Sequence, residues 1–290
     1  MTIHCAMLPD GRRLHLQHGP IDLVIEAWGE PAEVGTAYGQ AAACFQHVLH
    51  SLVAELPVLR QAIGSSKPTL RDPVAQHMLE ACWPYRADFI TPMAAVAGAV
   101  ADHVLAALLA GRRLRKAYVN NGGDIAIHLT PGEFFDCGLV ADLALPRLFG
   151  KMHITSEWGV GGLATSGAAT KGNGGRSFSF GIADSVTVLA INAAAADAAA
   201  SMIANAVDLP AHPSIDRQPA SAQDPDSDLG ARLVTMKVPP LGDVEIEAAL
   251  ARGLVLAEEL RQRGLIEAAV LTLQGQLKIC GAEQQLLSAA

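Results

Sequence analysis

The sequence predicts an α+β fold in which antiparallel sheets pack against alanine-rich helices. The first observation is that helical and strand-like segments come in clusters along the chain and do not alternate strictly. The second is that 50% of the 290 residues are hydrophobic but only 4% are aromatic, which favours helices packed closely through small side chains. We expect a single domain over residues 1–290, with a division into two subdomains as the alternative.

Charge and cysteine usage exclude several classes of protein. The net charge is −8, from 21 basic and 29 acidic residues, and no basic run is present, so nucleic acid is not an expected partner. The five cysteines form no C-x-x-C pair, which is typical of free thiols in a reducing compartment. No apolar run reaches the ~20 residues of a bilayer span, and Asp10, Arg12 and Arg13 interrupt any signal-peptide core. We therefore expect a soluble cytoplasmic protein without a membrane partner.

The first part of the chain predicts a hairpin followed by helices. Strands over Arg13–His18 and Ile21–Trp28 are joined at Gly19-Pro20. A helix is expected over Glu30–Ile63, which Pro57 ends or kinks. Two further helices are predicted, the second preceded by a hydroxyl cap and a proline, Thr91-Pro92: Val74–Trp83 and Met93–Ala110.

The middle and end of the chain add the remaining strands and helices. Strands are predicted over Lys116–Asn120, Ile125–Leu129, Phe134–Val140, Lys151–Trp158, Asp184–Ile191 and Arg232–Val238, with one or two more in Ile266–Ile279. Helices are predicted over Ala193–Val207 and Asp243–Arg263. Residues 208–230 contain four prolines and exceed an ordinary connection, so we interpret them as a lid, a crossing loop or a linker.

Glycine and hydroxyl residues between Gly159 and Arg176 suggest a site for an anionic, nucleotide-like ligand. Backbone N–H groups and hydroxyls near Thr165, Ser166 and Gly167 could cradle a pyrophosphate, with Lys171 and Arg176 opposing its charge. The spacing matches neither the P-loop nor the dinucleotide fingerprint. A flexible glycine loop is therefore an equally supported interpretation.

A turn over Asn120-Asn121-Gly122-Gly123-Asp124 allows two interpretations. It could bring backbone close to a ligand, with the Asp124 carboxylate accepting a hydrogen bond from a ribose or an amine. An ordinary hairpin turn prefers the same residue types for backbone reasons alone. The pattern by itself favours the ordinary turn.

Asp197, Ser201 and Asn205 lie four residues apart and share a face of the predicted helix. A carboxylate and a hydroxyl so placed suit Mg²⁺, which takes few protein oxygens and keeps waters or phosphates. On pattern alone, a solvent-exposed stripe on a helix with buried alanines is the better supported interpretation. Elsewhere, Cys44, His47 and His50 could share a helix face, but no further ligand is spaced to complete a zinc site.

In order, four segments of the chain resemble motifs of the ApbE superfamily, the FAD:protein FMN transferases. They are Ala95–Gly98 with Asp102, Asn121–Ile125, Ala164–Gly167, and Ser185–Val188 leading to Ala196–Ala198 and Ser201. The resemblance covers roughly Thr91 to Val207 and is closest to the soluble, uncharacterised branch of that superfamily. It implies an ApbE-like α+β fold that binds a flavin nucleotide, FAD or FMN, with Mg²⁺.

The resemblance also implies which residues bind the cofactor and the metal. Asp197 and Ser201 would hold the metal, with a backbone carbonyl near Val100 as a further ligand. The expected cofactor-binding residues are Gly122, Gly123, Asp124, Thr165, Ser166, Gly167, Lys171, Arg176 and Asp184. Two motifs differ: Ala97 replaces the lysine of a Lys-Gly-Tyr-Ala run, and residues 177–184 replace a His-x-x-Asp-Pro motif. These differences put covalent flavin transfer in doubt and leave the catalytic residues unknown.

Three hypotheses follow from the residues and the resemblance. The first is a flavin-nucleotide protein that, if it is an enzyme, acts at a phosphoanhydride with Mg²⁺. The second is a non-catalytic cofactor-binding or carrier protein. The third is an enzyme acting on another phosphorylated ring cofactor such as a pterin. The alanine-rich helices are also compatible with a homodimer.

Overall fold

The computed structural model describes residues 3–140, 148–167, 178–281 and 286–288. Contacts between residues divide the chain into two compact units. The first unit contains Met1–Phe134, Thr155–Ala164 and Ala190–Ala198, and the second contains Phe135–Ile154, Thr165–Leu189 and Ala199–Ala290. Lys171 and Arg176 lie outside the described residues.

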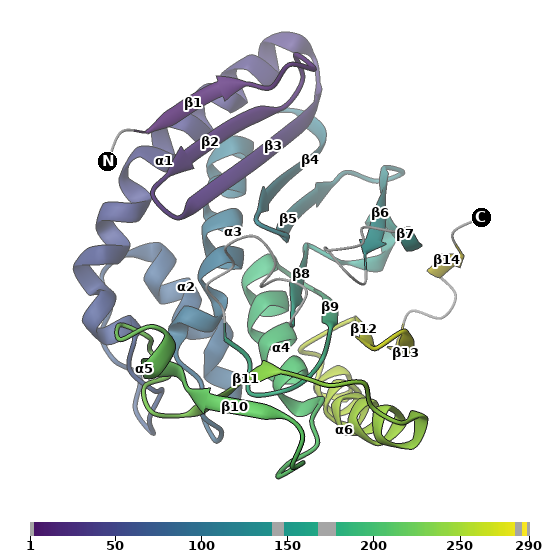
Figure 1. Cartoon of the computed structure of the whole chain (residues 1–290). Helices are drawn as coiled ribbons and strands as arrows, with labels where there is room; N and C mark the ends of the chain where they lie inside the picture. The colour runs from purple at the N-terminus through teal and green to yellow at the C-terminus, as the bar shows by residue number, and fades with distance from the viewer. Residues whose placement is uncertain (1–2, 141–147, 168–177, 282–285, 289–290) are drawn as a thin grey trace. The chain divides into compact units, whose positions relative to one another are not determined.

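The strands of the first unit form an antiparallel run in the order β1-β2-β3-β4-β5-β8 (Figure 1). They are β1 (His4–Met7), β2 (Leu14–His18), β3 (Ile21–Gly29), β4 (Leu114–Asn121), β5 (Asp124–Leu129) and β8 (Gly162–Ser166). Alternate residues such as Leu16, Leu23 and Ile25 are fully buried, as the two-residue period of a half-covered sheet requires. The hairpin predicted at Gly19-Pro20 is confirmed.

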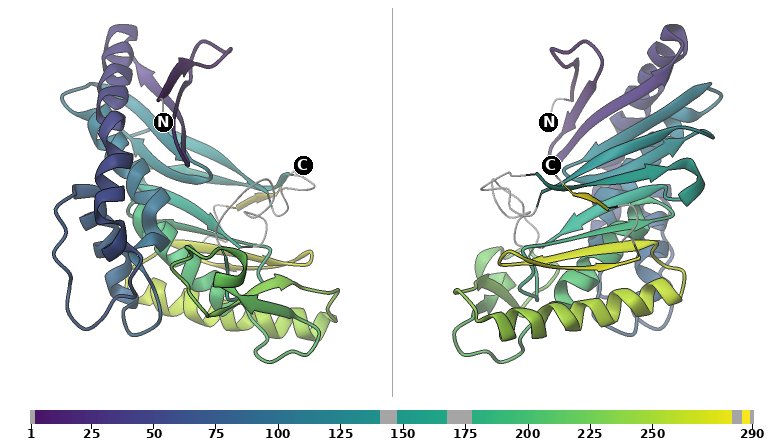
Figure 2. Two further views of the ribbon diagram at one scale, coloured as in Figure 1. Left: turned by 60° about the vertical axis from the view of Figure 1, so that its left-hand side comes forward. Right: turned by 90° about the vertical axis from the view of Figure 1, so that its right-hand side faces the viewer.

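Helices cover the buried face of these strands. α1 (Pro31–Leu59) packs against β2 and β3, and α3 (Val96–Leu109) packs against β4 and β5 (Figure 2). Phe45, Val48 and Leu52 form the buried side of α1. α2 (Pro73–Cys82) lies against α3, and the short 3₁₀ helices η1 (Trp83–Tyr85) and η2 (Pro92–Ala95) follow it. The expected hydroxyl cap is wrong, because the Thr91 side chain makes no capping hydrogen bond.

Two helical segments reach the length and hydropathy of a membrane span, Pro31–Leu59 and Pro92–Leu109, so the expectation that no run is long enough is wrong. Half of the second segment's apolar window is buried inside the protein, as for a core helix. The first lies near the N-terminus and has only 22% of its window buried. A core helix or a signal sequence meets the same criteria, so these lengths are weak evidence for a membrane span.

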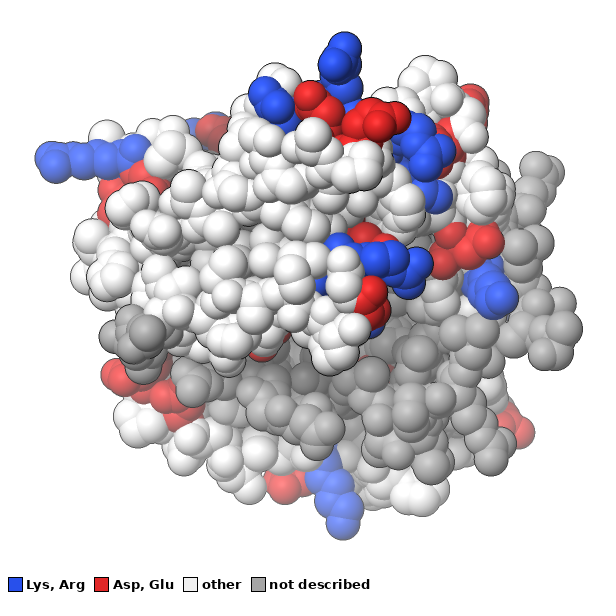
Figure 3. Space-filling model, turned by 90° about the horizontal axis from the view of Figure 1, so that it is seen from above, with Lys and Arg blue, Asp and Glu red and all other residues white. Residues whose placement is uncertain are grey.

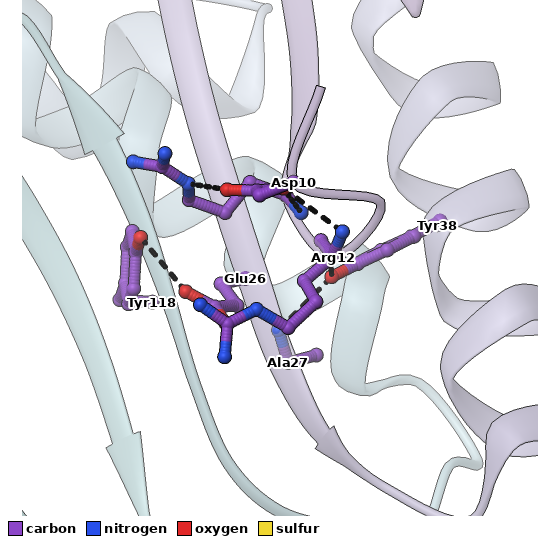
Figure 4. A network of polar contacts seen from close by, with 7 residues as sticks. Asp10, Arg12, Glu26, Ala27, Tyr38 and Tyr118 are labelled. Atoms are coloured by element: carbon purple, nitrogen blue, oxygen red, sulfur yellow. Dashed lines mark hydrogen bonds and ion pairs between the residues drawn. The ribbon is translucent and has the colours of Figure 1, made fainter. Parts of the chain in front are cut away.

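A polar network ties the first hairpin to the neighbouring strands and to α1 (Figure 4). The Tyr38 hydroxyl donates to the Arg12 carbonyl at 2.6 Å and accepts from the Ala27 N–H at 3.2 Å. The Tyr118 hydroxyl donates to Glu26 at 3.3 Å, and the Arg12 guanidinium lies 3.8 Å from the same carboxylate. Burial and the Glu26 charge raise the pKa of Tyr118 to about 12.

Acidic and basic side chains lie beside one another on the face of the molecule seen from above (Figure 3).

The second unit contains the remaining strands. β9 (Ser185–Ala190), β12 (Ala268–Leu273) and β13 (Gln276–Cys280) are antiparallel neighbours, and every residue of β9 and β12 is buried. A three-stranded sheet has the order β14-β7-β6, formed by β6 (Phe134–Val140), β7 (Leu148–Thr155) and β14 (Leu286–Ser288). The inner strand predicted at Asp184–Ile191 is confirmed.

Three helices and a small sheet complete this part of the chain. α4 (Ala193–Ala206) follows β9, and α6 (Asp243–Gln262) packs against β12 and β13. Gly253 allows α6 to lie close to Val207, because a Cβ added at this position would be 2.3 Å from a Val207 methyl group. Residues 208–230 are not wholly irregular as predicted: they contain β10 (Asp216–Pro219), which pairs with β11 (Leu233–Lys237), and the one-turn helix α5 (Ala220–Gln223).

The α+β class with antiparallel sheets is confirmed. The prediction of a glycine-rich loop is wrong for Gly162–Ser166, which form the strand β8. Its glycines are explained by packing: an added Cβ would lie 2.1 Å from the Ile191 carbonyl oxygen at Gly161 and 2.2 Å from the Ala193 nitrogen at Gly162. These glycines let the strand lie directly against the start of α4.

Candidate functional site

The first turn of α4 is held by an aspartate from another helix. The N–H groups of Ala193 and Ala194 donate to the two carboxylate oxygens of Asp102, on α3, at 3.0 and 2.9 Å. The Asn192 side chain accepts from the Ala195 N–H at 2.8 Å, as an ordinary helix cap does. Because the N–H groups of a first turn have no partner within their own helix, these oxygens satisfy them and stabilise the helix start.

α4 does the same for α3. Its Asp197 carboxylate accepts from the N–H of Gly98 at 3.1 Å and from the N–H of Ala97, both in the first turn of α3. Each helix therefore carries the aspartate that caps the other. Gly98 makes this contact possible, because an added Cβ would lie 2.3 Å from the Ala193 carbonyl oxygen. The small residues of α3 accommodate the backbone of α4.

The hairpin between β4 and β5 is fixed against the same helix start. Its two turn residues, Gly122 and Gly123, have φ angles of +66° and +114°, which only glycine adopts without strain. The Asn120 side chain accepts from the Gly123 N–H at 2.8 Å. The Asn121 side chain donates to the Ala97 carbonyl at 3.0 Å. The turn therefore connects β4 and β5 as an ordinary hairpin turn does, and it also places Asp124 beside α3.

Asp197 is a carboxylate under strong electrostatic stress. Burial raises its pKa well above 3.8, and the charges of Asp124 and, less strongly, Asp102 raise it further. The N–H groups of Gly98 and Ala97 act in the opposite direction but do not compensate. Burial and the charge of Asp197 in turn raise the pKa of the buried Cys82 thiol. Repulsion between Asp124 and Asp197 is the condition that a bound cation relieves.

The donor atoms at this place fit Mg²⁺ better than a softer metal. Asp197 and Asp124 offer carboxylates. Ser201 follows one turn after Asp197 on α4, and its hydroxyl as a ligand stays a prediction. Among the described residues, no group of three or more His, Cys, Asp or Glu side chains could hold a metal ion. A cation bound here would therefore complete its coordination with water or ligand oxygens, as Mg²⁺ commonly does. Val100 is fully buried inside α3, and its carbonyl as a ligand stays a prediction.

The second unit contains four of the other predicted cofactor-binding residues. The Thr165 hydroxyl lies 2.9 Å from that of Thr187 on β9. Gly167 has a φ of +128°, and an added Cβ would lie 2.7 Å from the Asp184 carbonyl oxygen. The Asp184 carboxylate accepts from the Gln274 N–H. Ser166 ends β8 next to this group, and the cofactor role of all four stays a prediction.

The interpretation of Asp197 and Asn205 as a solvent-exposed stripe is wrong. Asn205 accepts from the Phe180 N–H at 2.9 Å and from the Ser179 hydroxyl at 3.1 Å, and Asp197 caps α3. Sequence reasoning missed the roles of Asp102 and Asn121. Asn192, directly before the alanine run, is the signal that could have located the start of α4.

A family model shows the family to which the chain belongs. The family model described as "AbpE bacteria" matches residues 5–279. The UPF0280 protein of Methanothermobacter thermautotrophicus is 39% identical over 122 residues, covering 42% of this chain and 44% of the relative. The UPF0280 protein of Methanothrix thermoacetophila is 40% identical over 123 residues, covering 41% and 46%. The chain thus spans about half the length of the curated relatives it matches.

Among solved structures, the fold is similar to a variant of the flavin transferase ApbE from Vibrio cholerae. The alignment covers 93% of this chain and 97% of that one, with 13% sequence identity and a TM-score of 0.47.

Proposed function

Since the chain belongs to the AbpE bacteria family, whose model spans residues 5–279, we propose that it binds a flavin nucleotide, FAD or FMN, together with Mg²⁺. The cation would lie at Asp197, with Asp124 beside it and Ser201 one turn further along α4. The flavin part of the proposal comes from the resemblance of the motifs to those of FAD:protein FMN transferases. The metal part rests on the carboxylates themselves.

One observation carries the proposal: the Asp197 carboxylate, which accepts from the Gly98 N–H at 3.1 Å, lies near the carboxylate of Asp124. Burying a carboxylate next to another one costs free energy unless a cation or a proton compensates it. Asp197 is partly exposed, so an ion can reach it from solvent. When bound, Mg²⁺ would neutralise phosphate oxygens and polarise a phosphoanhydride.

The chain's own residues would bind and orient the ligand. The Gly122–Gly123 turn carries no side chain and an added Cβ would meet nothing within 4 Å at either position, so the backbone there is open to a ligand. The Asn121 and Asp102 hydrogen bonds hold the hairpin and α4 on α3, which keeps the two carboxylates in place. Covalent flavin transfer is not part of the proposal, because Ala97 replaces the lysine of the transferases.

The test is a titration of the purified protein with FAD and with FMN, with and without Mg²⁺, followed by flavin fluorescence and calorimetry. We expect binding that is tighter with Mg²⁺ and an Asp197→Asn variant that loses the Mg²⁺ effect. Asp22→Asn is the matched control, because Asp22 is an exposed aspartate of β3 that contacts His15. Absence of binding to both nucleotides, with and without the metal, would overturn the proposal.

A second assay separates a binding protein from an enzyme. The protein is incubated with FAD and Mg²⁺, and AMP release is measured. Binding without AMP supports a cofactor-binding or carrier role, whereas AMP release shows chemistry at the phosphoanhydride. Binding of a pterin phosphate in place of either flavin would favour the third hypothesis, an enzyme for another ring cofactor.

A further inference from the structure

A buried histidine in the first unit has a ring nitrogen to which no described residue forms a hydrogen bond. His18 ends β2 with 1% of its surface exposed, and its Nδ1 atom has no partner among the described residues. A buried polar atom left unpaired costs free energy, so native proteins pair almost all of them with protein groups, water or ions. The nitrogen of His18 therefore leaves a place for a water or an ion as its partner.

A second imidazole lies next to it. His50, on α1, has its ring centroid 5.1 Å from that of His18, with the two planes tilted by 51°. The ring centroids of Phe45 and His18 lie 6.4 Å apart in an edge-to-face arrangement, so Phe45 packs against the buried imidazole. His50 is exposed, so a small ion has a route from solvent to the pair.

The separation of the two rings leaves room for a shared metal ion. With metal–nitrogen bonds of about 2.0–2.1 Å and a tetrahedral angle, two imidazole centroids bridged by one ion lie ~5 Å apart. We propose that His18 and His50 together bind one borderline divalent transition-metal ion, with Zn²⁺ as the representative.

The chemistry of the pair supports this site. Imidazole nitrogen is a ligand that zinc and copper accept readily, whereas Mg²⁺ prefers oxygen. With two protein ligands, the remaining positions on the metal belong to water or to a small ligand, so the site is open and weaker than a four-ligand structural zinc site.

The sequence pattern indicated one of the two ligands, His50, as a candidate metal ligand. His50 shares α1 with Cys44 and His47, for which no partner was spaced along the chain. The fold supplies the partner from β2, 32 residues before His50, through the packing of α1 on the hairpin.

The experiment is a Zn²⁺ titration of the whole chain in a non-chelating buffer that contains excess Mg²⁺. We expect the His50→Ala variant to bind one equivalent fewer than wild type. His47→Ala is the matched control, since His47 is an exposed histidine one turn earlier on the same helix, and it should keep that equivalent. Equal zinc stoichiometry in His50→Ala and wild type would overturn the proposal.

A second measurement avoids any variant that disturbs the core. Imidazole nitrogen NMR spectra of the wild-type protein should show that the first equivalent of zinc shifts the His18 and His50 signals. If zinc shifts other histidines and not these two, or if His18 is satisfied by an ordered water only, the site does not exist. The Asp197→Asn variant should keep the zinc equivalent, so failure of the proposed flavin and Mg²⁺ binding leaves this result unaffected.

Discussion

The carboxylates of Asp10 and Asp197 have similar backbone hydrogen bonds, but the pKa of Asp10 is lowered and that of Asp197 is raised. Each carboxylate accepts two backbone N–H groups, from Arg12 and Arg13 for Asp10 and from Gly98 and Ala97 for Asp197. The pKa of Asp10 falls well below its usual range, chiefly through these N–H groups and then through the Arg13 side chain. The pKa of Asp197 rises instead, because burial and Asp124 outweigh its two N–H groups.

The difference shows what backbone N–H groups can and cannot compensate. Backbone N–H groups suffice for a carboxylate at the surface with a guanidinium beside it. They do not suffice for a partly enclosed carboxylate that faces a second one. The charge of Asp10 is compensated by its hydrogen bonds and by Arg13, whereas the charge of Asp197 would be stabilised by a bound cation.

The largest effect is expected from separating α3 from α4 with Gly98→Ala. The added Cβ would lie 2.3 Å from the Ala193 carbonyl oxygen, and no flexible side chain can move aside. We expect a loss of about 3 kcal/mol or more in the free energy of unfolding, measured by urea denaturation. The matched control is Gly35→Ala on α1, where an added Cβ meets nothing within 4 Å. This variant should gain about 0.5–1 kcal/mol. Equal effects in both variants would contradict the close contact.

The next effect concerns the cap that α3 provides for α4. Asp102→Ala leaves the N–H groups of Ala193 and Ala194 without their acceptor, so we expect a loss of about 1–2 kcal/mol in the free energy of unfolding. Asp22→Ala also removes an aspartate side chain, but an exposed one, and should change stability by less than about 0.5 kcal/mol. A loss no larger than that control would show that Asp102 does not hold the helix.

The stability of Asp197→Asn as a function of pH tests the raised pKa of Asp197 directly. Because the folded state raises the pKa of Asp197, it binds a proton more tightly than the unfolded chain does. Wild-type stability from this residue therefore falls as the pH rises above 3.8 toward the raised pKa, and the penalty is complete above it. In metal-free buffer the variant should be more stable than wild type at pH 7, and the gain should shrink on acidification. Thermal denaturation at several pH values measures this, and a gain that grows on acidification would contradict the sign.

The smallest effect is expected at Asp10, with the opposite trend. Its lowered pKa contributes stability that is present above pH 3.8 and is lost as the pH falls below that value. Asp10→Asn should therefore be slightly less stable than wild type at pH 7 and match it at low pH. Parallel thermal denaturation of the two variants sharpens the comparison, since similar pH profiles would show that their surroundings do not differ.

The sequence predicted most of the secondary structure and the fold class. The strands of the first hairpin, the strand before α4 and the alanine-rich helix all lie within a residue or two of their predicted bounds. These elements have strong local patterns, namely alternation, helical spacing and glycine turns. Residues 208–230 were predicted poorly, because β10 and α5 are short and depend on pairing with β11.

The site was predicted in part. The resemblance to the ApbE motifs selected Asp197 and Asp124, whereas their patterns alone favoured an exposed stripe and an ordinary turn. The structure places the two carboxylates near one another, and their roles in binding stay predictions. The role of Asp102 could not be predicted, because its partners lie 91 and 92 residues further along the chain and no local pattern marks such a contact. Gly161 and Gly162 suggested a phosphate loop, but a sequence cannot show that they adjoin residues 191–193.

The exchange of caps between α3 and α4 also constrains the order of events during folding. The Asp197 contact joins residues 99 positions apart, so α3 lacks this cap on the ribosome until α4 has been synthesised. Closing so long a loop costs chain entropy before any contact rewards it. We therefore expect the first turns of the two helices to gain protection from hydrogen exchange together, and late in folding.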